Sequence, residues 1–301
     1  PGLRALAALS AGVAAFVRAG HVVPTMSRSD GAWNASWALA ASPVVSAWAA
    51  ESLSRCHGLV SDREDLDRLL AALHARGIRL IGTNHFIPQN IEQYLPLPDP
   101  LRRLYRRFSW RDMASVFRRC DVVTAPTPLA VESMRANGFD FPMHALSNGI
   151  DAAQYDLKPG EVLPPRDRPT VLFVGRLDPE KHIDVLLRAV ASIADRSDVG
   201  VEIVGQGGEY DRLAELAQQL GIADRTEFRG FVSDEELRVA YLRADAFCQP
   251  GTAELQSLVS LEAMAASSPV LLADARALPH LVDEGVNGWL FPPGDHEQLG
   301  R

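Results

Sequence analysis

The feature that most constrains the fold is a regular alternation of short apolar runs and longer amphipathic segments from about residue 169 onward. The run Val171-Leu-Phe-Val174 contains no polar residue, which is typical of a strand buried on both faces. Strands are expected at residues 171–174, 201–204, 226–229, 246–249 and 269–273, and helices at residues 183–193, 210–220, 235–243 and 258–266. Because strands that alternate with helices form parallel sheets with right-handed crossovers, this half predicts an α/β, doubly wound domain.

The first half of the chain shows the same alternation less clearly. Strands are expected at residues 78–82 and 121–125, and helices at residues 65–76, 101–120 and 129–137. The Ala-rich residues 3–17 predict another helix rather than a signal sequence, because they carry no cleavage pattern. Residues 24–56 are rich in Ala, Ser and Trp and predict no clear strand and no chemistry.

A proline-rich segment divides the two halves. Residues 148–169 contain four prolines and two glycines, a composition typical of a domain boundary. The sequence therefore predicts two facing Rossmann-like domains, at residues 1–150 and 169–301, joined by a linker at residues 151–168.

Composition and charge exclude several classes of protein. A net charge of -8 argues against general nucleic-acid binding, although a local basic patch remains compatible with it. The three cysteines, Cys56, Cys120 and Cys248, are widely spaced and show no metal-ligand pattern, so we expect reduced thiols in a cytoplasmic protein and no metal site. No apolar run reaches the roughly 18 residues of a membrane-spanning helix.

Four charged residues of the second half suggest a ligand that carries both hydroxyls and phosphates. Glu254 and Glu262 are separated by seven residues, and carboxylates suit sugar and ribose hydroxyls. Arg176 and Lys181 follow an apolar run and a glycine, and such cations suit a diphosphate, although they are more often solvated surface charges. The combination predicts a site for a phosphorylated, hydroxyl-rich molecule.

Several motifs, in this order, resemble the retaining family 4 glycosyltransferases, which have the GT-B fold. In the second half the matching segments are residues 147–151, 174–181, 204–208, 228–231, 254–265 and 286–290. In the first half they are residues 83–85 and 121–127, and the resemblance as a whole spans about residues 78–295.

This resemblance implies a role for each charged residue and a UDP- or GDP-sugar as the donor, with no permanently bound cofactor. The residues matched by Arg176 and Lys181 bind the donor diphosphate, and the residue matched by Glu254 holds hydroxyls of the transferred sugar. Glu262 matches the residue that holds the nucleotide ribose. His85, at a predicted strand end, matches a histidine that reaches the reaction centre from the other domain, although it is also compatible with a core histidine. The implied reaction is hexose transfer with retention of configuration.

The chain departs from the family pattern in two ways. Leu255-Gln256-Ser257 stands where the family usually has Gly-Phe-Gly. We expect the backbone amides of Gln256, Ser257 and Leu258 to bind the sugar, and the N-terminus of the following helix to bind the diphosphate. The chain also begins after the family's first glycine-rich loop and stops at Arg301, before its terminal helices, which suggests truncation at both ends. A non-catalytic remnant that only binds nucleotide is therefore the alternative function.

The glycines at residues 205–208 are a weaker signal. They lack the G-x-G-x-x-G spacing and the acidic residue about 20 positions on that a nicotinamide-dependent dehydrogenase would need. Gly205 and Gly207 are expected to form a tight turn on the nucleotide side, and ordinary turn chemistry remains the alternative.

A basic segment in the first half suggests a membrane surface. Residues 101–111 contain five arginines beside Leu, Tyr, Phe and Trp. Arg102, Arg103, Arg106 and Arg107 are candidates for contact with anionic lipid at the inner face of the plasma membrane, with a membrane glycolipid as the acceptor. The alternative is a solvated helix that packs Leu104 and Phe108 into the core.

Overall fold

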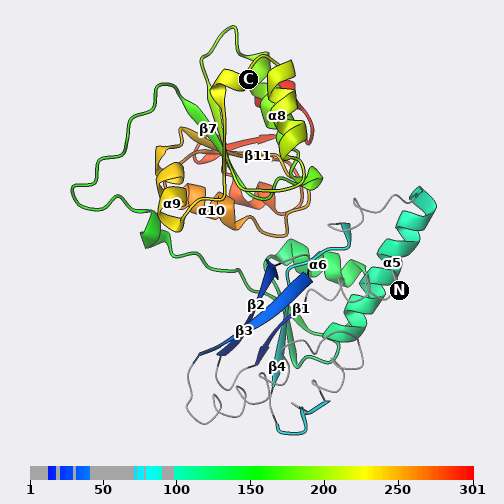
Figure 1. Cartoon of the computed structure of the whole chain (residues 1–301). Coiled ribbons are helices and arrows are strands. Elements are labelled where there is room, and N and C mark those ends of the chain that lie inside the picture. The colour runs from blue at the N-terminus through cyan, green and yellow to red at the C-terminus, as the bar shows by residue number, and fades with distance from the viewer. Residues whose placement is uncertain are drawn as a thin grey trace. The chain divides into compact units, whose positions relative to one another are not determined.

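The computed structural model forms two compact units, residues Pro1–Ser147 and Asn148–Arg301 (Figure 1). It describes the backbone of three strands at residues 13–17, 21–29 and 32–40, together with residues 71–72, 74–77, 79–89 and 98–301. Within these residues, no helix is long and apolar enough to cross a membrane. The same part of the chain holds no cluster of side chains suited to a metal ion.

The second unit is built on a six-stranded, all-parallel sheet in the order β12-β11-β10-β7-β8-β9. Its strands are β7 (Thr170–Val174), β8 (Gly200–Val204), β9 (Thr226–Gly230), β10 (Ala246–Gln249), β11 (Val270–Ala273) and β12 (Gly288–Phe291). Its helices are α7 (Ile183–Ser192), α8 (Tyr210–Gln219), α9 (Asp234–Arg243), α10 (Leu258–Ala265) and α11 (His296–Leu299). Every strand and helix expected in this half is present, with ends within one residue of those expected.

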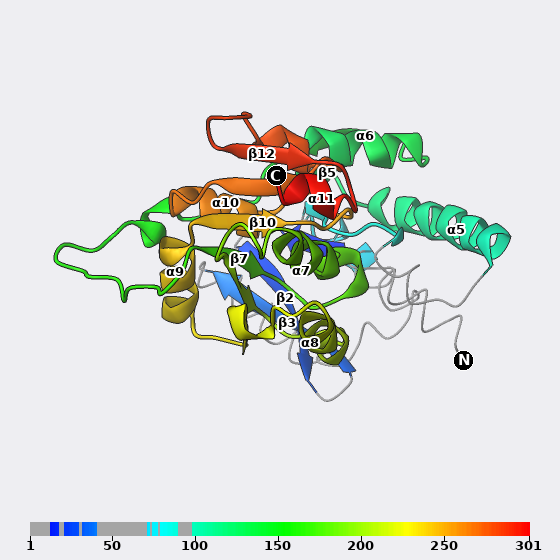
Figure 2. The same ribbon diagram turned by 90° about the horizontal axis from the view of Figure 1, so that it is seen from above.

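The strand order determines which helices cover each face of this sheet. The chain moves one way from β7 through β8 to β9, and the other way from β10 through β11 to β12. Right-handed crossovers in opposite directions place helices on opposite faces. Accordingly α7 packs against α8 and α11, whereas α10 packs against α9 (Figures 1 and 2). The fully buried side chains of Phe173, Ile203, Phe247 and Leu272 form the core between these layers.

The first unit contains a mixed six-stranded sheet in the order β3-β2-β1-β4-β5-β6. Its elements are β1 (Val13–Val17), β2 (His21–Ser29), β3 (Ala32–Ala40), β4 (Leu80–Asn84), α5 (Asp99–Phe117), β5 (Val122–Ala125), α6 (Pro128–Ala136) and β6 (Met143–Ala145). Strands β4 and β5 are parallel, as expected, and β6, which was not expected, pairs parallel with β5. Strand β1 runs antiparallel to β4 and β2, and β2 antiparallel to β3.

Two expectations for the first unit are wrong. Residues 13–17 form a strand instead of the end of a helix, because pairing along all of β4 overrides the helix preference of its alanines. Strands β2 and β3 lie in the region where no strand was expected. The sequence carries their signal, since apolar residues recur at every second position from Trp33 to Leu39. Asp30-Gly31, between the two strands, is the dipeptide typical of two-residue hairpin loops.

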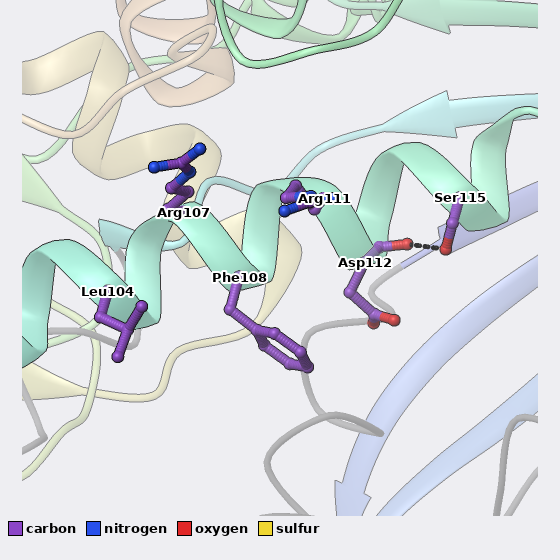
Figure 3. A pocket seen from close by; sticks show the side chains of 6 residues that line it. All are labelled: Leu104, Arg107, Phe108, Arg111, Asp112 and Ser115. Atoms are coloured by element: carbon purple, nitrogen blue, oxygen red, sulfur yellow. Dashed lines mark hydrogen bonds between the residues drawn. The ribbon is translucent and has the colours of Figure 1, made fainter.

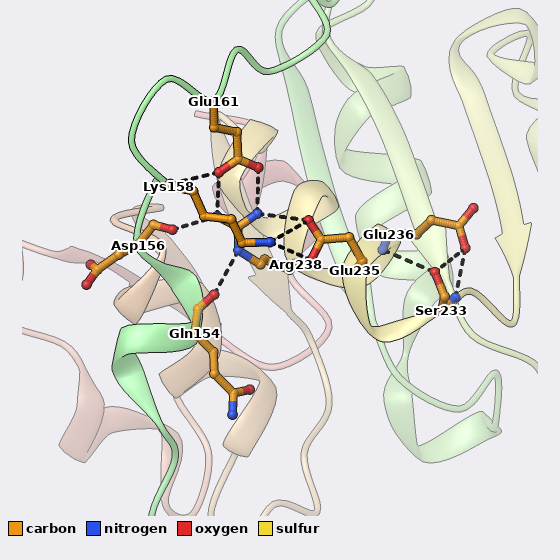
Figure 4. Close-up of polar contacts among 8 residues, drawn as sticks. All are labelled: Gln154, Asp156, Lys158, Glu161, Ser233, Glu235, Glu236 and Arg238. Carbon is orange, nitrogen blue, oxygen red and sulfur yellow. Dashed lines mark hydrogen bonds and ion pairs between the residues drawn. The ribbon is translucent and has the colours of Figure 1, made fainter.

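The segment expected to be a linker is attached to the second unit. Its short 3₁₀ helix η1 (Ala152–Tyr155) packs against α9 and α10. Arg238 of α9 donates from Nε to the Gln154 carbonyl over 2.8 Å and from Nη2 to the Asp156 carbonyl over 2.6 Å (Figure 4). The same guanidinium is paired with Glu161, and Lys158 is paired with Glu235. We call this set of contacts the Arg238 clamp.

Candidate functional site

The charged residues of the second unit lie at the topological switch point of its sheet. Strands β7 and β10 are neighbours, and the chain leaves them in opposite directions. In doubly wound sheets, ligands bind outside the carboxyl ends of the strands at this point. The loop after β7 carries Arg176 and Lys181, and the loop after β10 carries Glu254. The fold therefore brings residues that are more than 70 positions apart to one edge of the sheet.

Lys181 and Glu254 are in direct contact. The Nζ atom of Lys181 lies 2.5 Å from Oε1 of Glu254, and the two side chains are only 17% and 14% exposed. Lys181 ends the 3₁₀ helix η2 (Pro179–Lys181), which follows β7. Because the lysine contacts one carboxylate oxygen, the other oxygen keeps lone pairs for further donors.

Further contacts hold the two loops together. The backbone N–H of Thr252 donates to the Glu180 carbonyl over 3.4 Å, and the His182 ring pairs with the Thr252 hydroxyl over 3.2 Å. Gly251, one residue before Thr252, lies close to the first loop: an added Cβ would be 3.3 Å from the Glu180 carbonyl oxygen. The loops thus form one connected unit around the ion pair.

Arg176 lies at the outer side of this site. Its side chain is 65% exposed and forms ion pairs with Asp178 and, over 3.0 Å, with buried Glu180. Sequence analysis did not single out these two acidic partners. Their spacing of two and four positions from Arg176 within one motif was the available signal.

The start of α10 provides backbone donors beside Glu254. Ser257 is buried and caps the helix by accepting from the Ser260 N–H over 3.3 Å, so its hydroxyl is engaged inside the protein. Leu258, the first helical residue, is exposed. Gln256 accepts from the Asn148 N–H over 3.1 Å, which joins the loop to the start of the second unit. Ser257 caps only the Ser260 N–H, and the other N–H groups at a helix N-terminus suit an anion.

Glu262 lies about one turn after Leu258 on α10 and is half-buried. Its Oε2 accepts a hydrogen bond of 2.7 Å from the hydroxyl of Tyr241, a residue of α9. Sequence analysis missed Tyr241, because nothing in the spacing of 21 positions between the two residues predicts that α9 and α10 pack there.

The glycines after β8 have a structural role in this region. A Cβ at Gly205 would lie 1.8 Å from the Gly175 carbonyl oxygen, and one at Gly207 would lie 2.3 Å from the Leu177 carbonyl oxygen. The Leu177 N–H also donates to the Gln206 carbonyl over 2.9 Å. These glycines therefore let the β8 loop pack directly on the loop that carries Arg176.

Two family models together cover nearly the whole chain. The model described as glycosyl transferases group 1 matches residues 156–301, and the model described as glycosyltransferase family 4 matches residues 9–154. The chain belongs to the family 4 glycosyltransferases. The motifs of its second half and the doubly wound, parallel sheet of its second unit agree with this membership.

The chain is similar, over part of its length, to several curated proteins. It is 31% identical over 189 residues to an uncharacterized glycosyltransferase of Methanocaldococcus jannaschii, over 59% of this chain and 48% of that protein. It is 40% identical over 147 residues to a D-inositol 3-phosphate glycosyltransferase of Streptomyces scabiei, over 46% of this chain and 33% of that protein. A GDP-mannose-dependent alpha-mannosyltransferase of Corynebacterium glutamicum is 29% identical over 63% of this chain and 45% of its own length. The chain thus spans less than half the length of these relatives.

Solved structures confirm the GT-B fold of this family 4 chain. HepE of Anabaena, solved in complex with UDP, has a TM-score of 0.64 at 22% identity, over 86% of this chain and 72% of that one. Sucrose-phosphate synthase of Thermosynechococcus elongatus has a TM-score of 0.61 at 24% identity, over 73% of this chain and 56% of that one.

The first unit of this family 4 chain contains the remaining predicted site residues. His85 is exposed and follows β4, and partial desolvation by the surrounding protein lowers the pKa of its imidazole. A neutral imidazole near pH 7 suits hydrogen bonding to a hydroxyl. Its role at the reaction centre stays a prediction from the family resemblance.

The basic segment forms the first part of α5. Arg103 and Arg107 are exposed, whereas Arg102 and Arg106 are half-buried. Leu104 and Phe108 are 62% and 60% exposed, so the alternative in which they pack into the core is wrong. A groove of about 490 Å³ runs along this helix, lined by Leu104, Arg107, Phe108, Arg111, Asp112 and Ser115 (Figure 3). In Figure 3, Leu104 and Phe108 project to the same side of α5.

Proposed function

We propose that this chain transfers a hexose from a UDP- or GDP-sugar to an acceptor with retention of the anomeric configuration. The observation that carries the proposal is the contact between Lys181 and Glu254 at the switch point, beside the N-terminus of α10. A cation, a carboxylate and a helix N-terminus are groups that suit the phosphates and hydroxyls of a nucleotide sugar. Among the described residues, this edge of the second sheet is where these groups come together.

The proposed chemistry separates the sugar from the diphosphate. The bond between the anomeric carbon and the phosphate oxygen breaks, and its electron pair stays on the leaving diphosphate. Lys181, Arg176 and the α10 N-terminus stabilise this charge, which is the kind of interaction that contributes most to such catalysis. The acceptor hydroxyl attacks from the same face and gives its proton to the leaving phosphate. Glu254 holds sugar hydroxyls through the oxygen that Lys181 does not occupy.

Both donor nucleotides have support among relatives. HepE was solved with UDP and with UDP-glucose, and the relative from Corynebacterium glutamicum is described as dependent on GDP-mannose. In our proposal Glu262 accepts from the ribose, which both nucleotides share, so the site residues do not distinguish the bases.

We also propose a membrane glycolipid as the acceptor, reached by peripheral contact of a cytoplasmic chain with anionic lipid. Exposed Leu101, Leu104 and Phe108 form a stripe at helical spacing along α5, and exposed Arg103 and Arg107 flank it. Apolar side chains beside cations are the pattern by which a helix lies on an anionic bilayer. The supporting observation is that this stripe faces solvent.

Nucleotide binding without turnover is the alternative function, and one experiment separates the two. Titration calorimetry with UDP and GDP should show binding of at least one nucleotide, and a labelled hexose should then move from the matching donor to a glycolipid extract. Binding without transfer or donor hydrolysis would favour the non-catalytic alternative. Absence of binding to either nucleotide would contradict both functions.

A further inference from the structure

The Glu262 carboxylate is held by a buried tyrosine that the proposed reaction does not use. The Tyr241 side chain has 0% exposure, and its hydroxyl lies 2.7 Å from Glu262 Oε2. Burial raises the pKa of Tyr241, and the negative charge of Glu262 raises it further. The phenol therefore stays protonated and donates to the carboxylate at every physiological pH.

A second tyrosine reaches the same carboxylate from η1, near the start of the second unit. Tyr155 is the one residue of positions 151–160 that is not exposed. Its ring meets that of Tyr241 edge to face, with centroids 5.6 Å apart and planes at 85°. Burial, the charge of Glu262 and a hydrogen bond to Glu262 raise the pKa of Tyr155 to about 12.

The Arg238 clamp fixes Tyr155 in this place. Arg238 binds the carbonyls of Gln154 and Asp156, which are the two residues on either side of Tyr155 (Figure 4). Only 7% of the Arg238 side chain is exposed, and its guanidinium also forms an ion pair with Glu161. The backbone around Tyr155 therefore has little freedom to move away from α9 and α10.

We propose that Tyr241 and Tyr155 are positioning residues, which hold the Glu262 carboxylate in the orientation that receives the two ribose hydroxyls of the donor nucleotide. The inference rests on the proposed function, in which Glu262 accepts from the ribose. A carboxylate has about four lone-pair sites, so two tyrosine donors leave roughly two for a vicinal diol. Without the tyrosines, the Glu262 side chain would have to be ordered when the nucleotide binds, and this cost would lower the affinity for the ribose.

The test compares ribose nucleotides with analogues that lack both hydroxyls. Affinities of UDP, GDP and their 2′,3′-dideoxy forms are measured by calorimetry on the unaltered chain and on Tyr241→Phe, Tyr155→Phe and Glu262→Gln. The unaltered chain should prefer the ribose form by about tenfold or more, the effect of one hydrogen bond to a charged group. Tyr241→Phe should lose most of this preference by weaker binding of the ribose form alone, and Tyr155→Phe part of it.

Coupling and control variants separate positioning from a general structural role. In a Glu262→Gln background, Tyr241→Phe should cause no further loss of preference, because both changes remove the same interaction. Tyr105→Phe, which removes a hydroxyl from the first unit, should leave the preference unchanged. Equal weakening of ribose and dideoxy forms in both tyrosine variants, or an unchanged preference, would overturn the inference while leaving the proposed function intact. An unaltered chain that binds neither UDP nor GDP would overturn both.

Discussion

The Nζ atom of Lys181 lies 2.5 Å from Oε1 of Glu254, and this contact joins the loops that leave the neighbouring strands β7 and β10. Both side chains are largely buried, so each charge has the other as its close counterion. A donor that enters between these loops would meet a lysine already placed for phosphate and a carboxylate already placed for hydroxyls. Such preorganisation reduces the free energy needed to order the site during binding.

Replacement of Glu254 is expected to remove transfer and leave the fold intact. Glu254→Gln keeps the shape of the side chain but loses the charge, and the drop in turnover should be about 100-fold, as for loss of one group that stabilises a transition state. Initial rates of transfer and of donor hydrolysis measure the effect, and circular dichroism checks the fold. Glu284→Gln, a change of the same kind at an exposed carboxylate, is the control. Unaltered turnover in Glu254→Gln would contradict its assigned role.

Replacement of Arg176 is expected to weaken nucleotide diphosphate binding. Its side chain is 65% exposed, but its partners Asp178 and Glu180 are largely buried, so the variant is also expected to lose some stability, and circular dichroism checks that it stays folded. Arg176→Ala should raise the Kd for UDP or GDP by about 10- to 100-fold, the range of a hydrogen bond to a charged group. The monophosphates should lose less, because they lack the second phosphate.

Arg118→Ala is the matched control for this prediction. Arg118 is 55% exposed, lies at the end of α5 in the first unit and is paired with Asp140. Its loss removes the same charge from the other unit. Equal effects of the two variants on diphosphate affinity would refute a specific role for Arg176.

The second half was predictable because several of its strands, such as β7 and β11, are largely continuous apolar runs between amphipathic helices. Phe173 and Phe247 lie in such runs, and both are fully buried. A short apolar run of this kind is typical of a strand buried on both faces. The first half was harder, since β1 ends an Ala-rich segment whose helix preference points the other way. Only its pairing with β4, far along the chain, makes it a strand.

The site residues were predictable one by one, but their contacts were not. Motif order singled out Lys181 and Glu254, while their contact depends on β10 lying next to β7, which is a property of the sheet. The partnership of Tyr241 with Glu262 depends on how α9 packs against α10. Periodicity in a single sequence shows which face of a helix is packed, but not which helix it packs against.

Removal of the exposed arginines of α5 is expected to weaken binding to anionic vesicles. Arg103→Gln combined with Arg107→Gln should lower the partition coefficient by roughly 30-fold at low salt, since each cation near an anionic surface contributes about 1 kcal/mol. Leu104→Ser combined with Phe108→Ser should weaken binding at high salt as well, because burial of apolar surface is not screened. Sedimentation with vesicles containing phosphatidylserine measures both effects.

The control for the membrane prediction changes the same charge elsewhere. Arg135, on α6, and Arg188, on α7, are exposed residues outside α5. Their combined replacement by Gln should leave sedimentation unchanged. Equal loss in the two double variants would show that net charge alone governs binding, and no loss in either would reject the membrane surface.

The Arg238 clamp is expected to make stability depend on acidic pH in a predictable direction. A hydrogen bond from Arg238, aided by the Lys158 N–H, lowers the pKa of Glu161 from 4.5 to about 2. Because the folded pKa is below the unfolded one, the stabilising contribution is complete above pH 4.5 and is lost as the pH falls toward 2. Glu161→Gln should therefore lower the melting temperature at pH 7, and its difference from the unaltered chain should shrink between pH 4.5 and 2. Glu297→Gln, at an exposed carboxylate of α11, should show no such change. A difference for Glu161→Gln that stays constant over this pH range would contradict the ionised pair.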